Sequence, residues 1–141
     1  MTIATELLRQ HVETLVDDPM TWQGLLAPEI VWELPFAAVL GHPTCLSGRD
    51  AVVRHAGWFV ESVAHFRYFD LTIEALTDPA RAVAEVKAEG IIKATRRTYR
   101  QTYIVFLRAE TGKIAFLREY FDPVRAAQAL DAPILELRRL R

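Results

Sequence analysis

The sequence is poor in the features that mark several large classes of protein. It has one cysteine, Cys45, among 141 residues, so no disulfide can form within the chain, which is typical of a reducing compartment. No apolar run reaches the roughly 20 residues that a membrane-spanning helix needs. The amino terminus lacks a basic start followed by an apolar run, so it does not resemble a signal peptide. We therefore expect a soluble cytoplasmic protein.

Net charge and known catalytic motifs are equally scarce. The chain has 17 Lys and Arg against 18 Asp and Glu, a net charge of −1, so it offers no basic surface for a nucleic acid. It has no Gly-rich phosphate loop, no G-x-S-x-G elbow and no H-E-x-x-H motif. Its four histidines lack the spacing of metal ligands, and Cys45 near His42 is a weak case for a metal or a nucleophile. We expect neither a metal nor a cofactor.

The most informative stretch runs from Tyr99 to Asp122. Two runs rich in Tyr, Ile, Val, Phe and Thr flank a short turn over residues 110–113, and these residue types fit a pleated, half-buried surface. Gly112 supplies the positive φ that a tight hairpin needs. The stretch therefore predicts an antiparallel β-hairpin.

The hairpin is expected to have two unlike faces, because side chains alternate along a strand. In the first strand one face carries Tyr99, Gln101, Tyr103, Val105 and Leu107. In the second strand one face carries Ala115, Leu117, Glu119 and Phe121, and the other carries Ile114, Phe116, Arg118 and Tyr120. Apolar groups occur on both faces, so we expect a helix to cover one face and a second subunit, in a homodimer, to cover the outer one.

The rest of the sequence predicts helices first and most strands later. Helices are expected over residues 4–16, from Asp18-Pro19 to an end at Pro28, over 49–64, and from Asp122-Pro123 to Leu130. Further strands are expected over residues 29–34, 66–76 and 82–93. The connection over residues 35–49 is long enough to be a lid or binding loop that closes one end of a pocket.

This segregation of helices and strands predicts an α+β domain. A strongly bent, mostly antiparallel sheet would wrap around the N-terminal helices and form a cone-shaped barrel with one open end. We expect one domain over residues 1–131, followed by a tail or short helix over residues 132–141.

Glu119 is the first candidate for chemistry, because its carboxyl group is expected on an apolar face between Leu117 and Phe121. A buried carboxylate is costly unless it is paired or its pKa rises. A raised pKa suits a general acid or base near neutral pH. Two alternatives stay open: an ion pair with an arginine such as Arg97, or a shift of one residue in strand register that would put Glu119 in water.

His55 is the second candidate, because it borders the apolar stripe of the helix expected over residues 49–64 and titrates near neutral pH. A helix packed across a curved sheet would direct this side chain into the cavity; the alternative is a half-exposed histidine at the helix edge. Tyr99 is a possible hydrogen-bond donor at the cavity mouth, although tyrosines on strands more often belong to the core. The other expected ligand contacts are Gln101, Tyr103, Phe59, Trp58 and Phe36.

A resemblance to a known family is carried by three segments: Ser47–Trp58, Gly112–Ile114 and Arg118–Pro123. They resemble the SnoaL-like branch of the nuclear transport factor 2-like superfamily and, within it, the phenazine biosynthesis A/B proteins. The resemblance is strongest between residues 47 and 123 and weak over the first 46 residues. It implies a cone-shaped α+β barrel that is usually dimeric through the outer sheet face.

The resemblance also implies an activity. The phenazine proteins assist the condensation of two amino-ketone molecules toward a tricyclic phenazine precursor, with a histidine and a glutamate as acid–base groups and a tyrosine that contacts the ligand. By position these residues are His55, Glu119 and Tyr99. The family has a small polar residue one turn after the histidine, where this chain has Phe59, so the resemblance does not fix the substrate. Relatives with this fold include steroid isomerases, epoxide hydrolases and polyketide cyclases.

Three hypotheses follow. The first is a cofactor-independent enzyme in which Glu119 and His55 transfer protons on a carbonyl or imine substrate in an apolar pocket, in a condensation, cyclase or isomerase reaction. The second is a non-catalytic protein that binds a small ligand in the same pocket, since fold does not fix function. The third is an interacting dimer whose cone is filled by side chains.

Overall fold

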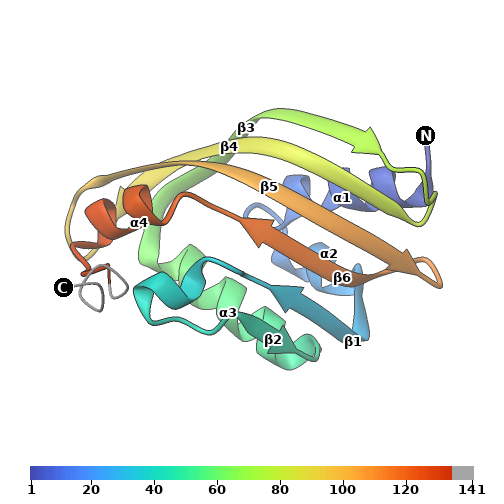
Figure 1. The fold of residues 1–141 in the computed structure, drawn as a ribbon, viewed down its shortest axis with the longest axis horizontal. Coiled ribbons are helices and arrows are strands. Elements are labelled where there is room, and N and C mark those ends of the chain that lie inside the picture. Colours follow the sequence, from blue (N-terminus) through green and yellow to red (C-terminus); the bar gives the residue numbers. More distant parts are fainter. Residues whose placement is uncertain (135–141) are drawn as a thin grey trace.

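The structure is a computed structural model and describes residues 1–134 (Figure 1). Its helices are α1 (Ile3–Thr14), α2 (Pro19–Gly24), α3 (Arg49–Ser62) and α4 (Pro123–Leu130), with a 3₁₀ helix η1 at Ala37–Leu40. Its strands are β1 (Leu26–Glu33), β2 (Cys45–Ser47), β3 (Val63–Ala75), β4 (Arg81–Ile92), β5 (Thr98–Glu110) and β6 (Lys113–Tyr120). The tail or short helix expected over residues 132–141 lies, from residue 135 on, outside the described residues.

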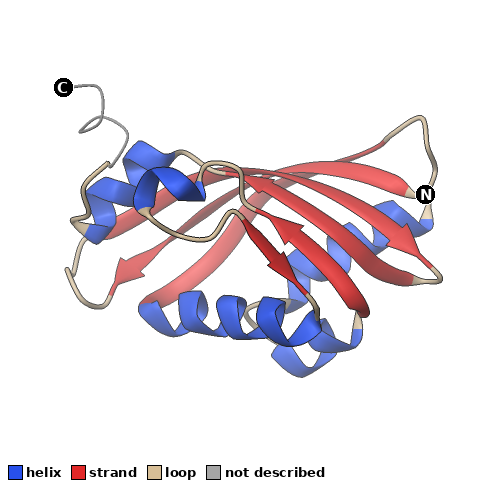
Figure 2. Cartoon of the chain, turned by 60° about the horizontal axis from the view of Figure 1, so that its bottom comes forward, coloured by secondary structure: helices blue, strands red, loops and turns tan. Residues whose placement is uncertain are grey.

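The strands form one curved sheet in the order β2-β1-β6-β5-β4-β3. Neighbouring strands are antiparallel, except that β1 and β6 are parallel. Helices α1, α2 and α3 lie on one face of the sheet, and α4 lies at one end of it (Figure 2). This arrangement confirms the predicted α+β class, with a bent, mostly antiparallel sheet around the N-terminal helices.

Helix α2 begins as predicted but ends earlier. Asp18 caps it by accepting a hydrogen bond from the Thr21 backbone N–H at 3.3 Å, and Pro19 is its first residue. The helix ends at Gly24, so the expectation that Pro28 ends it was wrong; Pro28 lies within β1. A proline is tolerated there because the pairing of β1 with β6 is irregular between Leu26 and residue 31.

The β5–β6 hairpin confirms the prediction made from its turn. Thr111 and Gly112 both have positive φ, 51° and 74°, as the tight turn between twisted strands requires. The β5 face that carries Tyr99, Gln101, Tyr103, Val105 and Leu107 is buried along its length. One side chain of β6 departs from the predicted alternation: Ile114 pairs with Ala109 and points into the core, not outward with Phe116. The cause is a β-bulge that leaves Ala115 unpaired between the two.

The connection over residues 35–49 holds more regular structure than the sequence predicted. Besides η1 it contains β2, which pairs antiparallel with β1 at one edge of the sheet. In the part of the chain that the structure describes, no helix has the length and apolar character needed to cross a membrane. The cytoplasmic location stays a prediction.

Gly90 on β4 lies where no side chain fits. A Cβ atom at this position would lie 2.5 Å from Val63 Cγ1 and 3.1 Å from the carbonyl oxygen of Ala64. Strand β3 comes this close because its pairing with β4 is irregular between Ala64 and Arg67. The glycine therefore lets β3 bend against β4 near its start, directly after α3.

We expect Gly90→Ala to lower the free energy of unfolding by about 1–3 kcal/mol, the usual cost of overpacking a tight site. Urea unfolding followed by circular dichroism measures the change. Gly57→Ala is the matched control, because Gly57 is exposed on α3 and its added methyl group would meet no atom within 4 Å. This control is expected to be neutral or stabilising by up to about 1 kcal/mol. A Gly90→Ala protein as stable as the Gly57→Ala protein would contradict the prediction.

Candidate functional site

A mostly apolar cavity lies inside the curve of the sheet, against α3, α4 and η1. The space open to the centre of a water molecule is about 90 Å³, several times what a single water needs. Much of its wall is aliphatic or aromatic, as at Leu34, Leu40, Val60, Ile92 and Phe121. The hypothesis of a cone filled by side chains does not fit this cavity. Ala37, Leu40 and His42 place part of the connection over residues 35–49 in the wall.

Polar side chains reach the same cavity from several elements. Glu119 on β6 and His55 on α3 both line it, as do Trp32, His42, Tyr68, Tyr99 and Tyr103. Among the described residues the wall contains no lysine and no arginine. The two residues that the sequence singled out as acid–base candidates are therefore exposed to one common space.

Glu119 is buried, with 9% of its surface exposed, at a position on β6 opposite Val105 of β5. Burial raises the pKa of its carboxyl group to about 8, and the described residues provide no hydrogen bond or ion pair that would offset this burial. Both alternatives weighed from the sequence fail: the register keeps Glu119 inside, and Arg97 donates instead to the Gln128 carbonyl oxygen at 2.7 Å. The group is mainly protonated at pH 7.

Three tyrosines lie close enough to Glu119 for its charge to affect their pKa values. Burial raises the pKa of Tyr68, Tyr99 and Tyr103 most, and Glu119 raises each of them further. The pKa of Tyr99 is about 12, and its hydroxyl lies 2.7 Å from that of Tyr103. All three side chains are therefore neutral hydroxyl groups at physiological pH. Tyr68 was missed by the sequence analysis, because irregular pairing on both sides of it in β3 breaks the alternation that would have revealed its face.

His55 is partly buried between two tryptophans. The edge of its ring meets Trp32 at 5.7 Å between ring centroids and 84° between planes, and Trp58 lies at the same distance. Burial lowers the pKa of His55, and the nearby His42 lowers it further. The imidazole is therefore mainly neutral at pH 7 and able to accept a proton.

The structure brings most, but not all, of the predicted contact residues to the cavity. Trp58, Phe59, Tyr99 and Tyr103 line it. Gln101 does not line the cavity. It is buried and hydrogen-bonds the backbone of Asp122: its Nε2 donates to the carbonyl oxygen at 3.0 Å, and its Oε1 accepts from the N–H at 2.8 Å.

Phe36 is the second predicted contact that lies outside the cavity wall. Its side chain is 44% exposed and packs against Tyr120, at 5.4 Å between ring centroids. The backbone turns into η1 directly after it, so the connection presents Ala37 and Leu40 to the cavity instead.

Comparison with known proteins gives a consistent result. The family model for a SnoaL-like domain matches residues 8–117. An uncharacterised PhzA/B-like protein of Pseudomonas aeruginosa is 30% identical over 128 residues, which cover 90% of this chain and 89% of that protein. The crystal structure of a phenazine biosynthesis-related protein of the same species, PhzB2, has a TM-score of 0.80 at 19% identity, covering 94% of this chain and 83% of that one.

A second solved structure shows the same fold with a small molecule bound. It is a protein of Catenulispora acidiphila with a ketosteroid isomerase-like fold, in complex with trimethylamine, with a TM-score of 0.71 at 14% identity. The match covers 93% of this chain and 96% of that one. From the family match, the similarity to the PhzA/B-like relative and the shared fold, we conclude that this chain belongs to the SnoaL-like family.

Proposed function

We propose that this chain is a cofactor-independent enzyme that transfers protons on a carbonyl or imine substrate held in the apolar cavity. The observation that carries the proposal is the burial of Glu119 in the wall of a cavity that His55 also lines. Two titratable groups whose environments push their pKa values apart form a natural acid–base pair. Tyr99 and Tyr103, with Trp58 and Phe59, would contact the ligand.

The direction of each pKa shift assigns the roles. His55, neutral at pH 7, would remove a proton from the carbon next to the carbonyl or imine group. Glu119, mainly protonated at pH 7, would donate its proton to the carbonyl oxygen or imine nitrogen, which yields an enol or enamine. Such a nucleophile is what a condensation, a cyclisation or an isomerisation needs. The similarity to a PhzA/B-like relative supports a condensation of the phenazine A/B kind within this range.

A non-catalytic ligand-binding protein is the second candidate. The Catenulispora protein with this fold is in complex with trimethylamine, which supports the binding of small molecules by proteins of this fold. The two candidates differ in what happens to the bound compound: an enzyme exchanges or rearranges its atoms, whereas a binding protein returns it intact.

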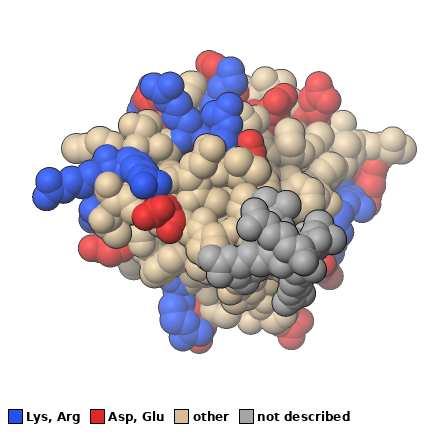
Figure 3. All heavy atoms as spheres, turned by 60° about the vertical axis from the view of Figure 1, so that its left-hand side comes forward, with Lys and Arg blue, Asp and Glu red and all other residues tan. Residues whose placement is uncertain are grey.

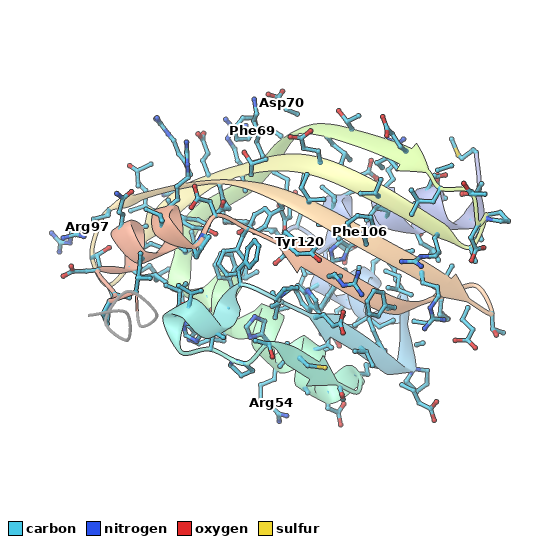
Figure 4. The ribbon with its side chains drawn as sticks, viewed as in Figure 1. Arg54, Phe69, Asp70, Arg97, Phe106 and Tyr120 are labelled. Carbon is cyan, nitrogen blue, oxygen red and sulfur yellow. The ribbon has the colours of Figure 1, made fainter. Side chains whose placement is uncertain are left out.

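A homodimer through the outer sheet face also belongs to the proposal. On β5 and β6, Phe106 and Tyr120 point to the face opposite the helices, and Phe36 packs beside Tyr120 (Figure 4). Aromatic side chains of this kind are enriched at protein interfaces. Sedimentation equilibrium tests this part of the proposal. We expect a dimer for the wild type and a weaker dimer for Phe106→Glu, and a wild-type monomer would contradict the proposal.

Hydrogen exchange provides a direct test of the proposed chemistry. In D₂O, an enzyme of this kind replaces the α-hydrogens of a ketone by deuterium, because the proton taken by His55 is lost to solvent before a deuteron returns. We expect the wild type to accelerate this exchange in cyclohex-2-enone above the buffer rate, as followed by proton NMR at pH 7. A ketone that binds but takes up deuterium no faster than in buffer alone would favour the binding protein.

A further inference from the structure

We propose that Phe59 limits the substrate of this cavity to a compound with a single ring. The inference rests on the proposed function for the reaction and narrows its substrate, because a cavity that one ring fills leaves no room for a second molecule beside it. It therefore favours a reaction of one molecule, an isomerisation or a cyclisation, over a condensation of two. The volume of the cavity, the position of Phe59 and the contacts that hold its ring carry the inference.

The cavity is small for a site that binds organic molecules. The space open to the centre of a water molecule is about 90 Å³. A cavity of about 150 Å³ can hold one benzene molecule, and pockets for drug-sized ligands occupy about 300–1,000 Å³. The cavity reaches the surface at Trp58, which lines it and is 48% exposed. One six-membered ring would therefore fill the space and extend to this opening.

Phe59 bounds the cavity beside the proposed reaction centre. It lies one turn after His55 on the same face of α3, and both side chains line the cavity. A substrate whose reacting carbon lies beside His55 meets Phe59 about 6 Å farther along the helix. On the sheet side, the Phe59 ring meets the ring of Tyr99 at 5.8 Å between centroids and 70° between planes. The phenyl group thus fills the space between α3 and β5 at this point.

The ring of Phe59 packs against side chains that are themselves held in place. Phe66, a buried core residue of β3, meets it at 5.2 Å between centroids and 88° between planes. The hydroxyl of Tyr99 lies 2.7 Å from that of Tyr103, in a hydrogen bond. Edge-to-face aromatic pairs are favourable beyond the area that they bury. Moving Phe59 aside for a second ring would break both of its pairs, so a larger ligand overpacks the site.

Helix α4, which supplies Leu130 to the cavity wall, is also anchored. Thr95 Oγ1 donates to the Ala129 carbonyl oxygen at 2.6 Å, and Arg97 donates to that of Gln128 at 2.7 Å. These carbonyl groups belong to the last turn of the helix, where they have no partner within the helix. Figure 3 looks onto this end of the molecule and shows basic and acidic side chains mainly around its edge. A shift of α4 that enlarged the cavity would break these hydrogen bonds.

Two ketones that differ by one ring test the inference by binding alone. 2-Decalone is cyclohexanone with a second fused ring, and its four added methylene groups, if simply buried, would tighten binding by about 10²-fold. Quenching of the fluorescence of Trp32 and Trp58, in the cavity wall, reports binding. We expect the wild type to bind cyclohexanone at least about tenfold more tightly than 2-decalone, because the second ring overpacks the site. Equal or tighter binding of 2-decalone, or binding of neither ketone, overturns the inference.

Phe59→Ala should reverse this order, with 2-decalone bound at least about tenfold more tightly, because the missing phenyl group leaves room for the second ring. Phe59→Leu, which keeps an aliphatic group against Phe66, should shift the ratio in the same direction by a smaller factor. Phe69→Ala is the matched control. Phe69 lies on the outer sheet face, with Arg67 Cζ 4.6 Å from its ring centroid, so this variant should keep the wild-type order (Figure 4). A folded Phe59→Ala or Phe59→Leu protein with the wild-type ratio also overturns the inference.

Exchange measurements on the same two ketones separate the size limit from the proposed reaction. A wild type that prefers cyclohexanone but exchanges none of its α-hydrogens would remove the proposed reaction and leave the size limit standing. Exchange of both ketones at similar rates, with similar affinities, would keep the reaction and overturn the size limit.

Discussion

Replacing Glu119 with glutamine is expected to slow hydrogen exchange of the ketone by about 10²- to 10⁴-fold, the range that a positioned acid or base contributes. The amide has nearly the same size and still donates a hydrogen bond, but it cannot release a proton to the substrate near neutral pH. Binding of cyclohex-2-enone to the variant, measured by quenching of the fluorescence of Trp32 and Trp58 in the cavity wall, separates lost chemistry from lost affinity. Turnover equal to that of the wild type would remove Glu119 from the mechanism.

Glu33→Gln is the matched control for this change. It makes the same replacement on the outer face of the sheet, where Glu33 accepts a hydrogen bond from Arg118 at 2.8 Å, and it is expected to leave the exchange rate unchanged. The pH profile gives a further test. The wild-type rate is expected to rise as His55 loses its proton, at a pH below 6.5, and to fall as Glu119 ionises near pH 8. Glu119→Gln should lose the alkaline limb and keep the acidic one.

The sequence predicted those parts of the fold that local chemistry determines. The hairpin turn at Gly112 and the start of α2 at Asp18-Pro19 each depend on a few neighbouring residues, and they were found where expected. The burial of Glu119 followed from simple alternation, because β6 is regular from Phe116 to Tyr120. This regular stretch is the reason that the site prediction placed Glu119 on the inner face.

Other features depend on contacts between distant segments and left no local signal. The bulge at Ala115 turned Ile114 inward, and the parallel pairing of β1 with β6 joins residues more than 80 positions apart. Tyr68 reaches the cavity from a strand whose alternation is interrupted twice. Gln101 lies on the same strand face as Tyr99 and Tyr103, but its side-chain amide is hydrogen-bonded to the backbone of Asp122. Sequence patterns predict the face of a strand on which a side chain lies, but not the group that the side chain contacts on that face.

Alkaline pH is expected to destabilise the protein through the same carboxyl group. The folded-state pKa of Glu119, about 8, lies above its ordinary value of 4.5, so the folded state holds a proton that the unfolded state has released between these two pH values. The contribution of Glu119 to stability is therefore fully present below about pH 4.5 and is lost as the pH rises through 8. Each pKa unit corresponds to about 1.4 kcal/mol, so the loss is on the order of 5 kcal/mol over the whole range.

His11 has the opposite effect at acidic pH. It is buried, its Nδ1 accepts a hydrogen bond from Trp22 Nε1 at 2.9 Å, and burial lowers its pKa from 6.5 to about 4. The unfolded state then binds more protons between pH 4 and 6.5, so this contribution to stability is complete above pH 6.5 and is lost as the pH falls through 4. Between about pH 4.5 and 6.5 the effects of Glu119 and His11 on stability oppose each other, and His55, whose pKa is also lowered, acts in the same direction as His11. Above pH 6.5 the effect of Glu119 acts alone.

We therefore expect the free energy of unfolding of the wild type, from urea titrations, to fall by on the order of 2 kcal/mol between pH 6.5 and 8. Glu119→Gln should abolish this decline, because glutamine has no proton to lose, and Glu33→Gln should retain it. The three cavity tyrosines do not contribute in this window, since burial raises their pKa values further above 10. A wild type whose stability is flat from pH 6.5 to 8 would show that Glu119 ionises normally, and the acid role in the proposed reaction would fail with it. The carboxyl group that weakens the fold at alkaline pH is thus the one on which the chemistry depends, as is common where active sites trade stability for function.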